Sequence, residues 1–172
     1  MSTPTITTHG PVTCLSVTGQ GEPGGAEYLS AIGALFTVAG PLGGPAGPLQ
    51  GLWWAEDDTR PALEVPRELW RWHLLLQPAA PLADGAIETA RETVRASGAA
   101  VDRVQVVTLT EGECVELLHE GPYSDEPRSL KILDAFIEEQ GLTRNGPHHE
   151  VYLTAFDDPS PRTVLRQPVR RG

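Results

Sequence analysis

The sequence predicts an α+β protein built from two similar halves. Two observations lead to this fold class: helical and strand-like hydrophobic patterns alternate along the chain, and segments 100 residues apart resemble each other without a gap. The chain has 172 residues, of which 40% are hydrophobic, which is enough for one domain or for two small fused ones. We therefore expect an internal duplication in which a helix covers one face of the antiparallel strands of each half.

The repeat is carried by short matching stretches. CLSVTGQG, from Cys14, aligns with CVELLHEG, from Cys114, and LWWAEDD, from Leu52, aligns with YLTAFDD, from Tyr152. The identities are sparse enough to arise by chance, but they need no gap and the predicted element types agree, which favours duplication. Further matches are Ile32 with Ile132, Phe36 with Phe136, Asp57 with Asp157, Asp58 with Asp158 and Pro61 with Pro161.

The first half reads as strand, helix, strand, strand. Apolar residues at helical spacing from Tyr28 to Phe36 predict the helix. The run GPLGGPAGP predicts a loop over 40–48, because Gly and Pro interrupt regular structure. In WRWHLLLQ, Trp70 and Trp72 alternate onto one face, as in a strand. The expected strands are residues 12–17, 52–55 and 69–77.

The second half repeats this order and is joined to the first by a helix. Asp84 is expected to cap that crossover helix, over 84–98, and Gly98 to end it. The second-half elements are expected at 113–119 (strand), 124–140 (helix, ended by Gly141), 150–156 and 163–167 (strands), with an extra strand at 104–109. The expected organisation is one domain over 12–169, with modules over 12–80 and 104–169 and tails at 1–11 and 170–172.

Two such modules related by a pseudo-two-fold axis would enclose a cleft, which is a preferred place for a ligand. The net charge of −10 disfavours direct binding to nucleic acid, which requires a basic surface, and suits neutral or cationic partners. Residues 1–11 are too few for a helix-turn-helix, so a DNA-binding element is not expected before the first strand.

The sequence also indicates the compartment. No apolar run reaches the length of a membrane span, and MSTPTITTHG lacks the basic and apolar regions of a secretory signal. We therefore expect a cytoplasmic protein in which Cys14 and Cys114 are free thiols of the core. The oligomeric state stays open.

Five motifs, in this order, resemble the GyrI-like small-molecule-binding family: LWW, WRWHLLLQP, HEGPYSDEP, GPHHEVYL and TVLRQPV. The resemblance covers residues 12–169 and implies two strand-helix-strand-strand modules around an aromatic cleft, with Glu150 at the pocket centre. It also implies an activity, since similar stand-alone members are hydrolases that open the cyclopropane of duocarmycin- and yatakemycin-type DNA alkylators. The loop at 40–48 departs from the pattern, because no lysine occurs between Tyr28 and Gln50, and it leaves the pocket shape on that rim open.

Glu150 is the first candidate site residue. It begins a strand on which Tyr152 shares its face, and a carboxylate in an apolar place needs a partner, a proton or a ligand. If it is buried, we expect desolvation to raise its pKa, as suits a general base or a counter-ion for a cation. The alternative is a solvated carboxylate at a strand end.

Two further catalytic candidates follow HEGP at a strand-to-helix turn. The Tyr123 hydroxyl could donate to a developing oxyanion or could belong to an ordinary turn. Glu126 could be a second pocket carboxylate or could stabilise the helix N-terminus by its charge. Glu120 is expected on the rim.

Aromatic residues and a histidine are the candidate ligand contacts. Adjacent residues on a strand face opposite ways, so one of Trp53 and Trp54 is expected to pack against a helix and the other to line the cleft. For the same reason His148, His149 and Glu150 should not converge on a metal, and no cofactor is expected. The ligand-binding candidates are Trp53, Trp54, Trp70, Trp72, Tyr152 and His149.

Two functions from different classes remain open. In the first, a hydrolase, tryptophans hold a planar ligand, Glu150 with Glu126 activates a water, and Tyr123 stabilises the oxyanion. In the second, the same cleft sequesters or senses hydrophobic, often cationic, compounds without changing them.

Overall fold

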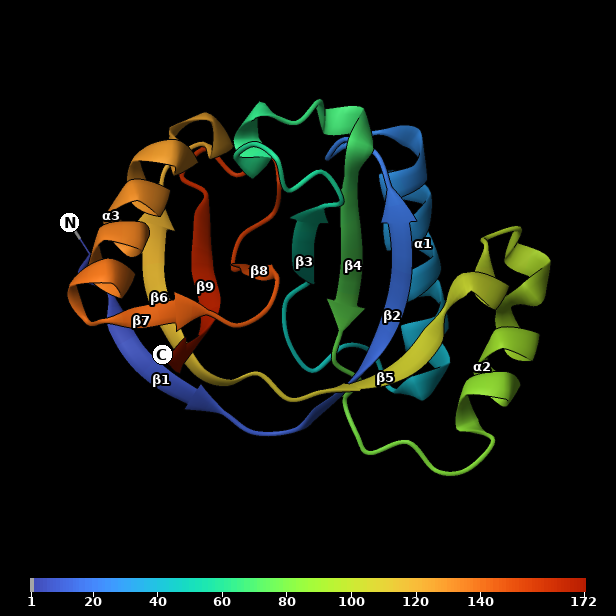
Figure 1. Ribbon diagram of the computed structural model, residues 1–172. Helices are drawn as coiled ribbons and strands as arrows, with labels where there is room; N and C mark the ends of the chain where they lie inside the picture. Colours follow the sequence, from blue (N-terminus) through green and yellow to red (C-terminus); the bar gives the residue numbers. More distant parts are fainter. Residues whose placement is uncertain (1) are drawn as a thin grey trace. The chain divides into compact units, whose positions relative to one another are not determined.

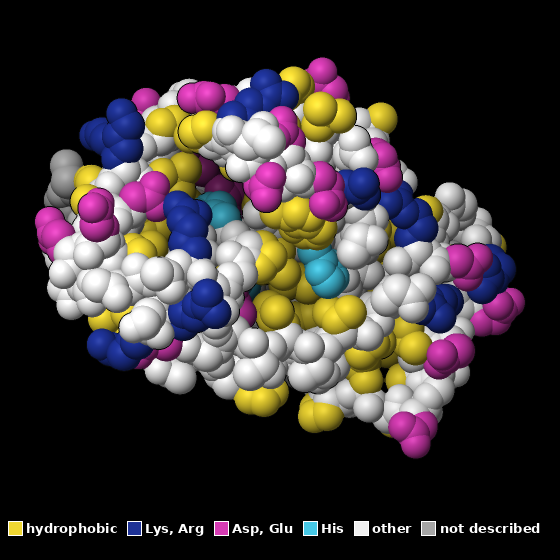
Figure 2. Space-filling view, viewed as in Figure 1, with side chains coloured by type: hydrophobic (Ala, Val, Ile, Leu, Met, Phe, Trp, Pro, Cys, Tyr) yellow, Lys and Arg dark blue, Asp and Glu magenta, His cyan; other side chains and the backbone are white. Residues whose placement is uncertain are grey.

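The computed structural model describes residues 2–172, and the chain forms two compact units. The first-half unit is Val12–Leu109, and the second-half unit joins the residues up to Pro11 to Thr110–Gly172. Both are antiparallel strands with a helix packed against them, which confirms the predicted α+β class (Figure 1). Among the described residues, the helices are all too short or too polar to cross a membrane. On the face that Figure 2 shows, acidic and basic side chains are interspersed rather than gathered by sign.

The first-half unit has the strand order β3-β4-β2-β5. Its long helix, α1, buries Tyr28, Leu35 and Val38, and α2 lies beside it (Figure 1). The expected crossover helix and extra strand therefore belong to this unit, since β5 pairs with β2. The elements are β2 (Val12–Gln20), α1 (Ala26–Ala39), β3 (Gln50–Ala55), β4 (Trp70–Leu76), α2 (Ala86–Val94) and β5 (Gln105–Leu109), with short 3-10 turns at Gly40–Leu42, Ala62–Glu64, Arg67–Leu69, Arg95–Ser97 and Val101–Arg103.

The second-half unit has the strand order β1-β6-β9-β8, and β7 also pairs with β9. Its core lies between this sheet and α3, where Val115, Leu117 and Leu165 pack against Leu133 and Ile137. The elements are β1 (Thr5–His9), β6 (Gly112–Glu120), α3 (Glu126–Glu139), β7 (Leu142–Arg144), β8 (His148–Tyr152) and β9 (Arg162–Arg171), with a 3-10 turn at Tyr123–Asp125.

The ends of the chain differ from the expected tails. Residues 5–9 form β1, which pairs with β6, and β9 continues to Arg171. The segment TITTH offers little apolar alternation, and its partner strand lies more than 100 residues along the chain, so local periodicity could not reveal the pairing.

The element positions support an internal duplication. Strand β6 and helix α3 begin and end 100 residues after β2 and α1, and β5 follows β1 by the same interval. The first strand of each repeat pairs with the second strand of the other, as Thr5 lies opposite Glu116 and Gln105 opposite Ser16. The repeat expected from the sequence thus extends to the positions of the elements.

Candidate functional site

Glu150 lies on β8 with its side chain toward α3. Its ladder partner is Leu165, a residue of the core that α3 covers, so the carboxylate is directed into the second-half unit and is buried. Tyr152 shares this face, as the strand period predicted, and its hydroxyl donates to Glu150 Oε2 over 3.2 Å. His148, also on this face, lies with Nε2 3.4 Å from Glu150 Oε1.

Glu126 is brought to the same place by the start of α3. It is the first residue of that helix, it is 9% exposed, and its carboxyl group interacts with that of Glu150. The 3-10 turn before the helix places the Tyr123 ring 6.3 Å from the ring of Tyr152. The structure therefore assembles the three residues expected to be catalytic, Tyr123, Glu126 and Glu150, within one unit.

The two carboxyl groups have opposite protonation. Burial, and then the charge of Glu150, raises the pKa of Glu126 to about 10, so Glu126 is a neutral acid near pH 7. Burial also disfavours the charge on Glu150, but the groups that hydrogen-bond to it outweigh burial and lower its pKa. The expectation of a raised pKa at Glu150 was therefore wrong: the shift falls on its neighbour, and the pair holds one proton.

Phe156 adds a third ring to the site. Its ring centroid lies 5.6 Å from that of Tyr152 and 6.3 Å from that of Tyr123, and the side chain is 49% exposed. Sequence reasoning did not single out this residue. The available signal was an apolar residue just beyond a strand that carries two candidate side chains.

His149 does not join this cluster. It faces away from Glu150, is 1% exposed, and its Nδ1 lies 2.8 Å from a carboxylate oxygen of Glu111, which also accepts a hydrogen bond from Arg166 over 2.9 Å. We therefore withdraw it as a ligand contact, because its ring belongs to a buried ionic network. Within residues 2–172, no group of three or more His, Cys, Asp or Glu side chains is arranged to hold a metal ion.

Three of the four tryptophans form a cluster with Tyr28 in the first-half unit. Trp53 lies 5.8 Å from the Tyr28 ring and 6.2 Å from Trp70, whereas Trp54 packs on the opposite face with Leu52. The prediction that Trp53 and Trp54 face opposite ways is confirmed.

Trp72 and Trp70 have structural roles in this cluster. Trp72 is fully buried against Tyr28, so it cannot contact a ligand without movement, and its place among the ligand contacts was wrong. The Trp70 indole donates to the carbonyl oxygens of Ala62 and Val65, which holds the preceding turns. Aromatic residue type alone does not separate core rings from ligand-facing ones.

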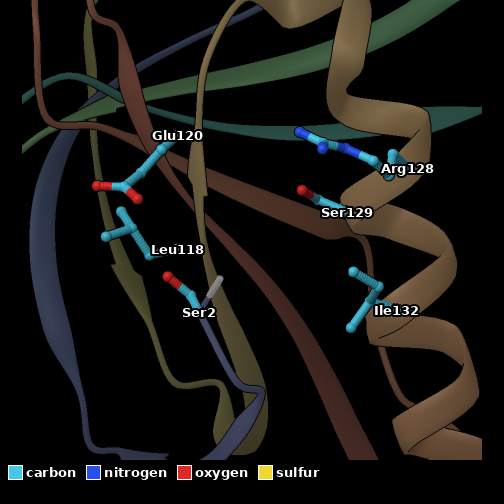
Figure 3. A pocket seen from close by; sticks show the side chains of 6 residues that line it. All are labelled: Ser2, Leu118, Glu120, Arg128, Ser129 and Ile132. Carbon is cyan, nitrogen blue, oxygen red and sulfur yellow. The ribbon is translucent and has the colours of Figure 1, made fainter.

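A small pocket lies between α3 and β6, apart from the carboxyl pair (Figure 3). Its volume of about 170 Å³ is below the several hundred Å³ that a drug-sized ligand fills. One acidic side chain, Glu120, and one basic side chain, Arg128, line this pocket, so it favours neither a cationic nor an anionic ligand (Figure 3).

Residues 85–166 match the model of the GyrI-like small molecule binding domain. This stretch is therefore similar to the GyrI-like family. The matched stretch contains the carboxyl pair and the tyrosines of the second-half unit, and the family resemblance of the motifs is confirmed. No curated protein matches the chain.

Solved structures extend the comparison to nearly the whole chain. An uncharacterized conserved protein from Listeria innocua is 29% identical, with 98% of this chain and 92% of that chain covered and a TM-score of 0.86. A hydrolase from Listeria innocua is 28% identical over the same shares, with a TM-score of 0.84. The EcmrR C-terminal domain is 11% identical, with 100% and 99% covered and a TM-score of 0.65, and this likeness shows the fold alone.

Proposed function

We propose that the protein is a cofactor-independent hydrolase of the GyrI-like family that opens the strained cyclopropane of planar, DNA-alkylating compounds of the duocarmycin and yatakemycin type. The observation that carries the proposal is the buried pair of Glu126 and Glu150, which holds one proton and so offers an acid beside a base. The likeness to a Listeria innocua hydrolase supports it. In this proposal the protein acts in the cytoplasm, in detoxification or self-resistance.

The rings of Tyr123, Tyr152 and Phe156 would hold the ligand. They lie 5.6–6.3 Å apart beside the carboxyl pair, and the half-exposed Phe156 gives a planar compound a surface on which to stack. Because Trp53 and Trp54 face opposite sides of β3, only one of them is still proposed as a ligand contact.

The carboxyl pair would carry the reaction. Glu150 takes a proton from water while the water oxygen forms a bond to the unsubstituted carbon of the cyclopropane. The ring C–C bond breaks, its electrons enter the dienone, and the carbonyl oxygen becomes a phenolate that Glu126 protonates. The product is the ligand plus one water, and the pair still holds one proton, which returns from Glu150 to Glu126 before the next turnover.

A sequestering or effector-sensing role without catalysis is the second candidate. It is favoured by the family description, a small molecule binding domain, and by the ionised Glu150 among aromatic rings, which suits a cationic ligand.

One experiment separates the two. The protein is incubated with an excess of a cyclopropane-bearing alkylator, and the ligand is followed by mass spectrometry. Several turnovers to a product heavier by one water support the hydrolase. Protection at one ligand per protein, with the ligand recovered unchanged, supports the binder.

A further inference from the structure

Three buried polar atoms, one of them in the carboxyl pair itself, have no hydrogen-bond partner within the described residues. They are Tyr123 Oη, Glu126 Oε1 and Thr163 Oγ1. Buried polar groups are nearly always paired, and each one left unpaired costs free energy. A cluster of three therefore points to a group that the site binds.

The three side chains surround one place. Thr163 is fully buried on β9, directly opposite Tyr152 of β8. Burial is the largest cause that raises the pKa of Tyr123. The Thr163 side chain counteracts this shift, and the negative charge of the Glu126–Glu150 pair adds to it. The influence of Thr163 acts only at about hydrogen-bond range, so the two hydroxyls lie close together, although they do not meet the geometry of a hydrogen bond.

All three groups carry a proton at neutral pH, and that of Glu126 is shared with Glu150. The Tyr123 phenol and the Glu126 acid keep their protons because their pKa values are raised, and Thr163 carries a hydroxyl. A tyrosine beside a carboxylic acid kept neutral by its surroundings is a combination that stabilises an oxyanion.

The fold does not demand a hydroxyl at residue 163. In the first-half unit the corresponding position is Trp72, since Trp72 lies opposite Gly19 as Thr163 lies opposite His119. Both positions are fully buried, yet one carries a large ring and the other a small polar group. A polar residue there needs a reason other than packing.

We infer that Tyr123, Glu126 and Thr163 form a subsite for one carbonyl oxygen of the ligand, and that Thr163 is a specificity-determining residue of the site. The inference rests on the proposed function, whose dienone carbonyl becomes the oxyanion, and it selects planar ligands that carry a conjugated ketone over planar hydrocarbons. Glu126 is then a hydrogen-bond donor and acid, not an aid to the base.

The test compares two planar tricyclic probes that differ at one oxygen, 9-fluorenone and fluorene. We expect the wild type to bind the ketone about 10-fold more tightly, since hydrogen bonds to a buried carbonyl are worth roughly that factor. Thr163→Val keeps the shape but removes the hydroxyl, and we expect it to weaken the ketone alone by about 3–10-fold. Thr163→Ser restores the hydroxyl and should restore the preference, and Tyr123→Phe, which removes only a phenol hydroxyl, is the second variant.

Stability and turnover separate a ligand role from a structural one. Because Thr163→Val removes an unpartnered hydroxyl, its melting temperature should equal or exceed that of the wild type. With the cyclopropane substrate, its kcat should fall about 10²-fold, as for the loss of one oxyanion donor, while its Kd for fluorene stays unchanged.

The outcomes are distinguishable. The subsite would be overturned if the wild type showed no preference for the ketone. It would also be overturned if Thr163→Val and Tyr123→Phe each weakened the ketone and the hydrocarbon equally. A ketone preference that depends on Thr163 in a protein without turnover would keep the subsite and remove the hydrolase. Turnover and preference both unchanged in Thr163→Val would keep the hydrolase and remove the subsite.

Discussion

At the scale of single residues, Glu150 shows how a buried carboxylate is stabilised inside an apolar unit. It accepts a hydrogen bond from Tyr152, lies near His148, and faces a second carboxyl group that carries the proton. Two like charges this close and this buried cannot both ionise, so one of the pair stays neutral. That division of roles provides both an acid and a base near pH 7.

The neutral state of Glu126 predicts a pH-dependent stability. Its pKa is about 10 when folded and near 4.5 when unfolded, so between these values the folded state holds a proton that the unfolded state has released. Stability should therefore fall as pH rises through this window. Glu126→Gln should remove this pH dependence. When the pH is raised from 5 to 9, the free energy of unfolding of the variant should therefore rise by about 1–3 kcal/mol relative to that of the wild type.

Chemical denaturation at both pH values measures this difference. Glu139→Gln, an exposed carboxylate at the other end of α3, is the matched control and should behave as the wild type. If the stability of the wild type and that of Glu126→Gln change with pH in the same way, Glu126 ionises normally.

At the scale of elements, the strand and helix periods predicted most of the architecture. The 3.6-residue spacing located α1 and α3, and alternation located β4 and the shared face of Glu150 and Tyr152. Periodicity could not show what depends on distant pairing: β1, the unit to which β5 belongs, and the burial of Thr163. The proximity of Glu126 to Glu150 was one of two alternatives that the sequence left open, since a glutamate at this place could also have stabilised the helix N-terminus.

The packing of Trp72 on Gly19 is a second prediction at this scale. A Cβ added at Gly19 would overlap the Trp72 indole, which is fully buried and cannot swing away. We expect Gly19→Ala to destabilise the protein by about 1–3 kcal/mol through overpacking. In a thermal melt, Gly10→Ala is the control, since nothing lies within 4 Å of a Cβ there. Equal melting temperatures for the two variants would refute this packing.

At the scale of the whole molecule, the chain passes twice from one unit to the other. It passes after Pro11 and again after Leu109, because β1 pairs in the second-half unit and β5 in the first-half unit. Each unit thus contains one strand that comes from the other repeat of the sequence. Neither repeat alone contains all the strands of a unit.

Removing residues 2–9 should therefore destabilise the second-half unit, although most of that unit lies at the other end of the chain. The deletion leaves the β1 side of β6 unpaired over Gly112–Glu116 and removes Thr7 and His9, which bond Glu116. We expect a loss of about 2–4 kcal/mol in denaturant unfolding, from several ladder hydrogen bonds. A deletion variant with the full-length midpoint would show that β1 contributes nothing to the fold.

Turnover by Glu150→Gln measures whether the carboxyl pair in the second-half unit performs the chemistry. The substitution keeps the shape and a hydrogen-bonding oxygen but removes the base. With a cyclopropane-bearing alkylator, we expect kcat to fall by roughly 10²–10⁴-fold, while the Kd of a neutral planar ligand stays unchanged. Wild-type turnover by Glu150→Gln would show that the carboxyl pair does not perform the chemistry.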